Sequence, residues 1–232
     1  KVNSPGGGVT ASDIIYRELN LFKSKKKIPI VALFMDTAAS GGYYISMSAD
    51  AIIAHPTTVT GSIGVIISSL NFKEGMDKIG VKDQTITSGP NKNILSPFDE
   101  FSPEKRKIIQ SIVDDMYKRF FNIVKKNRTK IDSQKLKSLA DGRIFTADQA
   151  FKEGLVDGIG YSEDAIKKLM SLPNYLKSPG SDNPKIITYT LTKKPVKNLY
   201  QTNDAIQKSS FDVIADYLKK DTGAKFHYLW KF

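Results

Sequence analysis

The distribution of apolar residues predicts a chain in which strands and helices alternate. The segment Pro29–Asp36 (PIVALFMD) is apolar at every position but the last, which is typical of a strand buried on both faces of a parallel sheet. Further strands are predicted at Ala51–Ala54, Val65–Ser69 and Gln84–Thr87, and helices from Thr10 or Ser12 to Phe22, at Gly41–Ala49 and at Phe72–Ile79. This alternation favours an α/β fold with right-handed crossover connections.

The longest predicted helix runs from Pro103 to Arg128. Ser102 precedes it and can cap its first turn, and proline is favoured at the first helical position. Its apolar positions recur at helical spacing and form one face: Ile108, Ile112, Met116, Phe120, Ile123 and Val124. The pattern therefore predicts a long amphipathic helix.

A change of composition near the end of the chain predicts three parts. Residues 173–184 are rich in proline, serine, asparagine and glycine, which is typical of a linker. Residues 1–172 form the expected main domain, and residues 185–232 form a C-terminal extension that serves packing or oligomerisation. A strand at Lys185–Leu191 and a helix from about Asp204 to Lys220 are predicted within this extension.

Composition and charge exclude several kinds of site. The chain has 232 residues, no cysteine and two histidines, His55 and His227, that lie far apart in sequence. Thiolate chemistry is therefore excluded, and no metal site is expected. The net charge is +11, and the lysine-rich runs at 23–27, 125–130 and 219–225 fit either solvated helix ends or contact with an anionic membrane surface. No nucleic-acid motif accompanies these runs, so no nucleic-acid partner is expected.

Two glycine-rich junctions could carry chemistry. Pro5–Gly8 (PGGG) follows a strand end and opens a helix, so its backbone N–H groups could face a developing oxyanion. It matches neither the dinucleotide-binding nor the P-loop pattern. Ala38–Gly42 (AASGG) joins the buried strand to a helix and resembles a nucleophile elbow, with Ala38 in place of the usual first glycine. A tight turn and a serine helix cap beside packing glycines remain the alternatives.

A serine nucleophile also needs a base. His55 precedes Pro56 at a strand end, and we expect it to be structural. A lysine can serve if it is kept neutral, which requires apolar surroundings because free lysine has a pKa of about 10.4. Lys92 is the candidate because no other charged residue lies between Asp83 and Asp99. An exposed loop lysine would fit this composition equally well.

Five motifs in the same order as in a known family strengthen this interpretation. They are Asn3–Gly8 (NSPGGG), Ala38–Tyr44 (AASGGYY), Thr60–Val65 (TGSIGV), Ser88–Pro97 (SGPNKNILSP) and parts of the segment Asp141–Asp157. Together they resemble the signal peptide peptidase A family, which comprises membrane-associated serine proteases of the Clp/crotonase superfamily. The resemblance covers residues 1 to about 170. It implies an α/β fold built as a Clp/crotonase-like stack of ββα units, with a C-terminal helical and strand extension, that assembles into a homo-oligomeric ring.

The resemblance also assigns roles to residues. Ser40 would be the nucleophile, and Lys92, which lies 52 positions later, would be the general base. Ser62 would orient the lysine, and the N–H groups of Gly7 and Gly41 would form the oxyanion hole. No cofactor or metal is implied. The implied function is a serine endopeptidase that degrades remnant signal peptides or other apolar peptides at the bacterial cell membrane, anchored by an N-terminal segment absent from this chain.

Two other functions fit parts of the sequence. A crotonase-type acyl-CoA enzyme would share the glycine-turn oxyanion hole and the Gly154–Asp157 segment. It would need carboxylates in its site, and none lies between Ser40 and Asp50. A catalytically silent, membrane-associated scaffold would bind membranes through its basic surfaces. Binding of a CoA thioester would identify the first, and liposome binding that does not depend on Ser40 would identify the second.

Overall fold

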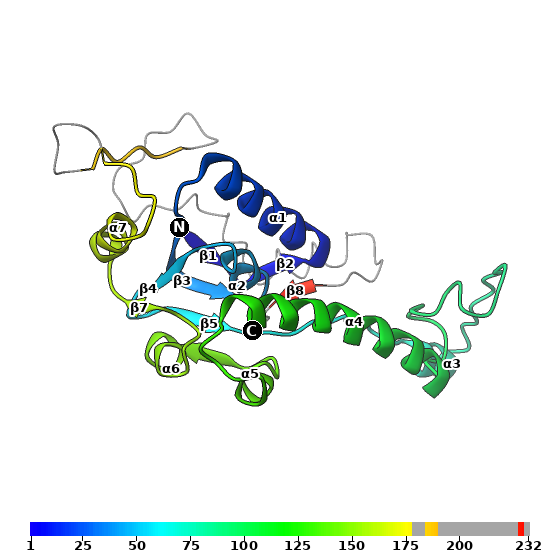
Figure 1. Ribbon diagram of the computed structural model, residues 1–232. Coiled ribbons are helices and arrows are strands. Elements are labelled where there is room, and N and C mark those ends of the chain that lie inside the picture. The colour runs from blue at the N-terminus through cyan, green and yellow to red at the C-terminus, as the bar shows by residue number, and fades with distance from the viewer. Residues whose placement is uncertain (178–183, 190–226, 230–232) are drawn as a thin grey trace.

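The computed structural model describes residues 1–177, 184–189 and 227–229, and it has a mixed α/β architecture with a twisted sheet at its centre (Figure 1). The strands of this six-stranded sheet are β1 (Val2–Ser4), β3 (Val31–Ala39), β4 (Ala51–Ala54), β5 (Val59–Gly61), β6 (Ile144–Thr146) and β7 (Gly158–Ile159). All pairs are parallel except β5 with β6. The α/β class and the central buried strand that the sequence predicts are confirmed.

The pairing of β3 decides which chain segments meet at one edge of the sheet. Phe34 pairs both with β1 and with β4, and Ala38 pairs both with β1 and with β5. Since a strand residue has two sides, β1 occupies one side of β3, and β4 and β5 follow each other along the other. The chain segments after β1, β3 and β5 therefore all leave the sheet at its carboxyl edge.

Helices pack on the two faces of the sheet and bury its apolar side chains. The helices of the main core are α1 (Val9–Lys26), α2 (Gly41–Ser46), α4 (Pro103–Asn127), α5 (Ser133–Leu139) and α6 (Ala147–Lys152). On the opposite face, α7 (Ser162–Met170) packs its Ala165 on Leu33 and Ile53. Because side chains of a strand alternate between faces, Leu33 belongs to this smaller cluster while Phe34 lies in the main core.

Residues 65–101, which we call the arm, project from the body of the molecule (Figure 1). The arm contains one short helix, α3 (Lys73–Lys78), as predicted. The strands predicted at Val65–Ser69 and Gln84–Thr87 are wrong, because the arm extends away from the sheet and, among the described residues, no strand ladder forms there beyond an isolated bridge at Ile66.

The long helix predicted at Pro103–Arg128 is confirmed as α4, with Ser102 capping it. Only part of its apolar face is buried. Phe120 and Val124 lie in the core, whereas Ile108 and Ile112 are 40% and 37% exposed. The half of α4 that carries the two exposed isoleucines continues from the arm, beyond the reach of the sheet (Figure 1). At the other long helix, α1, the N-cap is Gly8 and neither Thr10 nor Ser12.

The C-terminal extension contributes a strand that the sequence does not predict. β8 (His227–Leu229) pairs antiparallel with β2 (Gly6–Gly8), the glycine turn. The predicted strand at Lys185–Leu191 is not formed over residues 185–189, which have no regular structure, and the predicted helix at Asp204–Lys220 lies outside the described residues. Among the described helices, none is both long and apolar enough to span a bilayer.

Candidate active site

Ser40 lies at the turn from β3 into α2. Its backbone angles are φ +52° and ψ −113°, a conformation that is strained for a residue with a side chain. The Ser40 N–H donates to Gly61 O at 2.8 Å, and Ser40 O accepts from the Tyr44 N–H at 2.8 Å, so both sides of the turn are fixed. Ser40 is 1% exposed, and among the described residues its Oγ has no hydrogen-bond partner. The side chain makes no cap hydrogen bond, contrary to the helix-cap alternative.

The two glycines after Ser40 let α2 approach its neighbours closely. A Cβ atom on Gly41 would lie 2.6 Å from Ser12 Oγ, and one on Gly42 would lie 2.7 Å from Ser4 O. Real Cβ atoms do not make such contacts, so any side chain here would push α2 away from α1 and β1. The Ser-Gly-Gly sequence is therefore a packing requirement of this turn as well as a motif.

The glycine turn lies against the start of α2, the helix that follows Ser40. A Cβ atom on Gly41 would lie only 3.1 Å from Gly7 N, which places the two predicted oxyanion glycines side by side. Gly41 is the first residue of α2, so its N–H has no intrahelical acceptor. Gly6 has φ +111°, and it lies so close to Tyr228 O of β8 that a Cβ atom on Gly6 would collide with this oxygen. Two N–H groups arranged in this way can stabilise a developing oxyanion.

Ser62 lies next to the Ser40 turn because of strand register. Ala39 pairs with Gly61, so Ser40 and Ser62 are the residues that immediately follow two paired positions. Ser62 also has a positive φ, +50°, and is 7% exposed. Its N–H donates to Arg143 O at 2.8 Å, which fixes the turn on the segment before β6. The structure thus gathers Ser40, Ser62 and the two glycines at one edge of the sheet.

Lys92 is not part of this cluster. It lies in the arm, exposed to solvent, in a turn in which its N–H donates to Gly89 O at 3.1 Å. The arm leads away from the sheet edge that carries Ser40 (Figure 1). His55 is not a substitute, because its ring contacts Thr57 at 2.8 Å and packs on the Tyr161 ring at 5.0 Å. Within the described part of one chain, neither Lys92 nor His55 is placed to act as a base for Ser40.

β8 places an extended peptide across the glycine turn. Tyr228 pairs with Gly7 and is fully buried, with its ring stacked on Tyr44 at 4.8 Å and against Phe120 at 4.7 Å. The Tyr228 hydroxyl donates to Met116 O at 3.1 Å, and burial raises the pKa of Tyr228 to about 12, so the hydroxyl stays protonated. Apart from an aromatic residue near the end of the chain, no feature of the sequence indicates this contact.

No described part of the chain brings together three histidine or acidic side chains that could hold a metal ion.

The carboxylate of Asp13 is hydrogen-bonded to α2. It is occupied by hydrogen bonds from Tyr44 and Arg119. Sequence reasoning missed this cluster, because its three members come from three different helices and share no local pattern.

Comparison with known proteins identifies the family of this chain. Residues 22–175 match the model of peptidase family S49. The chain is 51% identical over 169 residues to the putative signal peptide peptidase SppA of Enterococcus faecium, which covers 73% of this chain and 48% of that protein. It is 40% identical to the putative protease slr0021 of Synechocystis (83% and 70% covered) and 37% identical to protease 4 of Salmonella typhi (74% and 27% covered).

The chain spans about half the length of the Enterococcus protein, so the relatives extend beyond the segment described above. The match nevertheless covers most of this chain and includes the Ser40 turn, Ser62 and the arm with Lys92. The resemblance that the five sequence motifs indicated is confirmed. The chain belongs to peptidase family S49.

Proposed function

We propose that this chain is the catalytic part of a serine endopeptidase that hydrolyses peptide bonds through an acyl-enzyme. The observation that carries the proposal is the Ser40 turn, where a buried hydroxyl with no hydrogen-bond partner among the described residues lies on strained backbone beside the backbone nitrogens of Gly7 and Gly41. Oγ of Ser40 attacks the peptide carbonyl carbon, and the two N–H groups stabilise the oxyanion. Lys92 takes the hydroxyl proton and returns it to the leaving amine, and water then releases the acyl group.

The way in which β8 lies on the glycine turn supports an extended peptide as the substrate. β8 uses backbone pairing with Gly6–Gly8, which any peptide can reproduce whatever its sequence. Its Tyr228 carbonyl oxygen and the Gly41 nitrogen both lie against Gly6. A substrate strand bound in the same way would present its own carbonyl to the N–H groups beside Ser40.

The exposed position of Lys92 favours a base supplied by a second copy of the chain. A lysine acts as a base only when it is neutral, and burial is what makes it neutral. Lys92 is exposed in the single chain, so we infer that docking of the arm against a neighbouring copy both buries it and brings it to that copy's Ser40. Ser62, which follows the strand position paired with Ala39, orients the incoming lysine. Repetition of this contact around an axis closes a homo-oligomeric ring.

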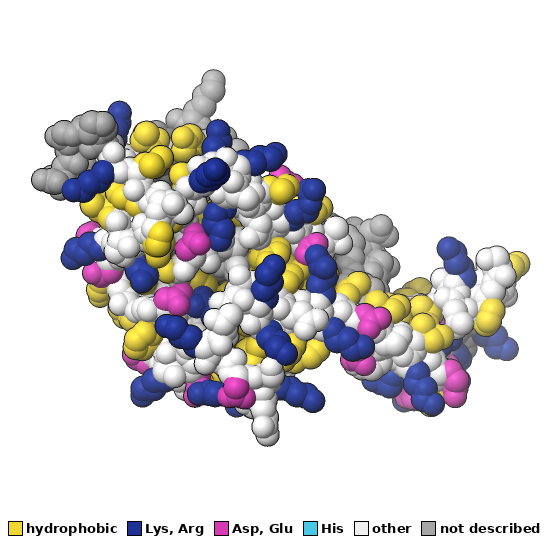
Figure 2. Space-filling view, in the orientation of Figure 1, with side chains coloured by type: hydrophobic (Ala, Val, Ile, Leu, Met, Phe, Trp, Pro, Cys, Tyr) yellow, Lys and Arg dark blue, Asp and Glu magenta, His cyan; other side chains and the backbone are white. Residues whose placement is uncertain are grey.

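The surface of the arm supports this assembly. A groove of about 970 Å³ lies between the arm and α4, and its lining includes Ile66, Leu70, Leu95 and Phe101. Figure 2 shows hydrophobic side chains gathered where the arm joins the body. Ile86, further along the arm, is 97% exposed. Exposed apolar surface of this extent marks an interaction site, and the arm of a second copy offers apolar residues to match it.

The detailed fold, the domain bounds and the substrate that we infer are those expected for a member of this family. We infer a Clp/crotonase-like stack of ββα units, a catalytic domain over residues 1–172, a linker over 173–184 and an extension over 185–232 that serves oligomerisation or packing. We also infer that remnant signal peptides or similar apolar peptides at the bacterial cell membrane are the substrates, since the Enterococcus relative is named a signal peptide peptidase. The excess of lysine fits attraction to an anionic membrane surface.

Labelling of the intact protein with a fluorophosphonate probe tests the proposal. We expect one adduct per active site, on the peptide that contains Ser40, because only an activated serine hydroxyl attacks the probe. Ser40→Ala should abolish the adduct, and Ser46→Ala, a matched change at the last residue of α2, should leave it. An adduct on another serine, or none at a concentration at which the assembly forms, would contradict the proposed function.

A further inference from the structure

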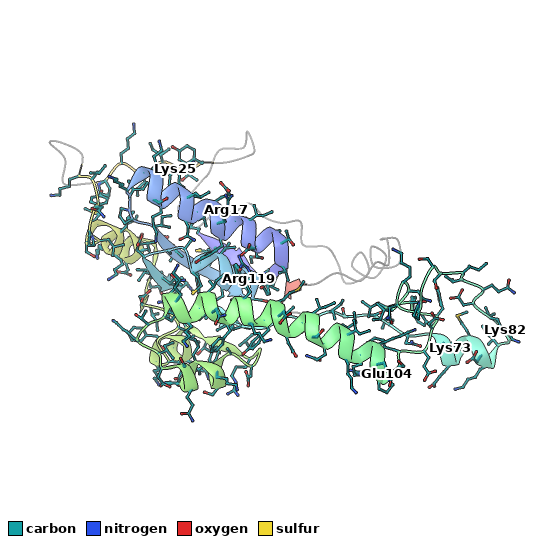
Figure 3. All side chains as sticks on the ribbon, turned by 45° about the vertical axis from the view of Figure 1, so that its right-hand side comes forward. Arg17, Lys25, Lys73, Lys82, Glu104 and Arg119 are labelled. Carbon is teal, nitrogen blue, oxygen red and sulfur yellow. The ribbon has the colours of Figure 1, made fainter. Side chains whose placement is uncertain are left out.

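The carboxylate of Asp13 joins three helices at one point. Its Oδ1 accepts a hydrogen bond from the Tyr44 hydroxyl at 2.5 Å, and it accepts two from Arg119, from Nε at 3.0 Å and from Nη2 at 2.6 Å. Asp13 lies in the first turns of α1, Tyr44 in α2 and Arg119 in the second half of α4. In Figure 3, Arg119 lies in the space between α1 and α4.

The protonation states of this cluster are fixed. Burial acts to raise the pKa of Asp13, but the hydrogen bonds from Tyr44 and Arg119 outweigh it and lower that pKa. Burial, together with the hydrogen bond to Asp13, raises the pKa of Tyr44. At neutral pH, Asp13 is therefore a charged acceptor and Tyr44 a neutral donor, which is the arrangement that the three hydrogen bonds need.

From Tyr44 the connection to the nucleophile is one helical turn. The Tyr44 N–H donates to Ser40 O at 2.8 Å, so Tyr44 closes the turn that holds Ser40. The Tyr44 ring is itself held by Tyr16, at 5.6 Å, and by Phe120, at 4.9 Å. Because the backbone, ring and hydroxyl of Tyr44 are all held by neighbours, Tyr44 fixes the position of α2 relative to α1.

A second connection leads from Asp13 to the glycine turn. The neighbouring residue Ser12 is buried, and its Oγ donates to Gly8 O at 3.1 Å and packs against Gly41. The first turn of α1 therefore contacts the segment that carries the Gly7 N–H on one side and the start of α2 on the other. Asp13 is therefore the chain neighbour of a residue that contacts both segments of the predicted oxyanion hole.

We propose that Asp13 is a positioning residue, which acts through Tyr44 and Arg119 to hold the Ser40 turn and the glycine turn in the reactive arrangement. The inference rests on the proposed function of Ser40. It has a physical basis in the length of α2, which has only six residues and begins at a strained serine, so that it cannot fix its own orientation. Displacements well below 1 Å between a nucleophile and its oxyanion donors are enough to slow catalysis.

Two isosteric changes test the inference. Asp13→Asn removes the charge that binds Arg119, and Tyr44→Phe removes only the hydroxyl. We expect each to lower kcat by about ten- to a hundredfold with KM within about twofold of the parent, because the substrate strand still binds while the reacting groups are misaligned. The rate at which a fluorophosphonate labels Ser40 should fall in parallel. The double variant should lose no more than the worse single variant, because both act through one contact.

The matched control is Asp115→Asn on α4, whose partner Lys118 forms an exposed ion pair at 3.0 Å. It removes the same charge and should keep the parental kcat. If Asp13→Asn does not fold, Tyr44→Phe decides alone, since it keeps the Asp13–Arg119 pair. Parental kcat in a folded Tyr44→Phe variant, or a loss explained by the unfolded fraction at the assay temperature, overturns the inference. Activity that survives in Ser40→Ala overturns the proposed function instead.

Discussion

Replacement of Ser40 by alanine is expected to abolish peptidase activity and leave the fold intact. Without Oγ there is no nucleophile to form the acyl-enzyme, and loss of such a group lowers kcat on the order of 10⁴- to 10⁶-fold. The side chain makes no hydrogen bond among the described residues, so its removal breaks none there. Hydrolysis of casein or of a signal peptide by the assembled variant is the measurement.

Ser46→Ala serves as the control for this change. Ser46 is the last residue of the helix that follows Ser40 and is also buried, but its Oγ is already engaged, because it donates to Gly42 O at 2.8 Å. We expect a small loss of stability and parental turnover. Parental turnover in Ser40→Ala itself would show that another residue is the nucleophile.

The second large effect is expected at Lys92. Lys92→Met keeps the length of the side chain and removes the amine, and Lys92→Arg keeps the charge but introduces a group that cannot be deprotonated in a protein. Both variants should lose base catalysis, which is worth about 10²- to 10⁴-fold, while they still assemble. The matched control is Lys82→Met, another exposed lysine of the arm (Figure 3), which should keep its activity.

Activity and oligomeric state measured on the same samples separate the two ways in which Lys92 could matter. Loss of turnover in an intact assembly supports a role in the reaction. An active Lys92→Met variant would show that Lys92 is only a solvated loop residue, an alternative that the composition of the surrounding segment also allows. Loss of assembly in Lys92→Met but not in Lys92→Arg would indicate a role in docking, through its charge.

The parts of the fold that the sequence predicts are those governed by long, regular patterns. β3 is a continuous apolar run and α4 is a capped amphipathic helix, so each carries its signal within its own residues. The arm carries no such long, regular pattern. Its apolar residues at 65–69 and 84–87 have the composition of strands, but a strand needs a neighbour, and the position of the sheet edge is not encoded locally.

The residues of the candidate site also differ in how far local sequence predicts their positions. Ser40, Ser62 and the glycine turn each follow one of the strands β1, β3 and β5, and because these strands are parallel to one another their carboxyl ends lie at one edge. The spacing of 52 positions between Ser40 and Lys92 does not indicate how close the two residues lie in space. In the structure, Lys92 lies in the arm, away from Ser40. Asp13 and Arg119, which are separated by 106 positions, meet only because α1 and α4 pack around α2. No local pattern could have indicated that contact.

Mixing two inactive variants tests whether the dyad forms between two copies of the chain, as we propose. Ser40→Ala keeps Lys92, and Lys92→Met keeps Ser40, so neither chain alone holds a complete dyad. If the arm of one copy serves the Ser40 of its neighbour, equal amounts dissociated and reassembled together should recover about one quarter of the parental active sites by random placement in a ring. Mixed assemblies that form and show no recovered turnover would contradict the account.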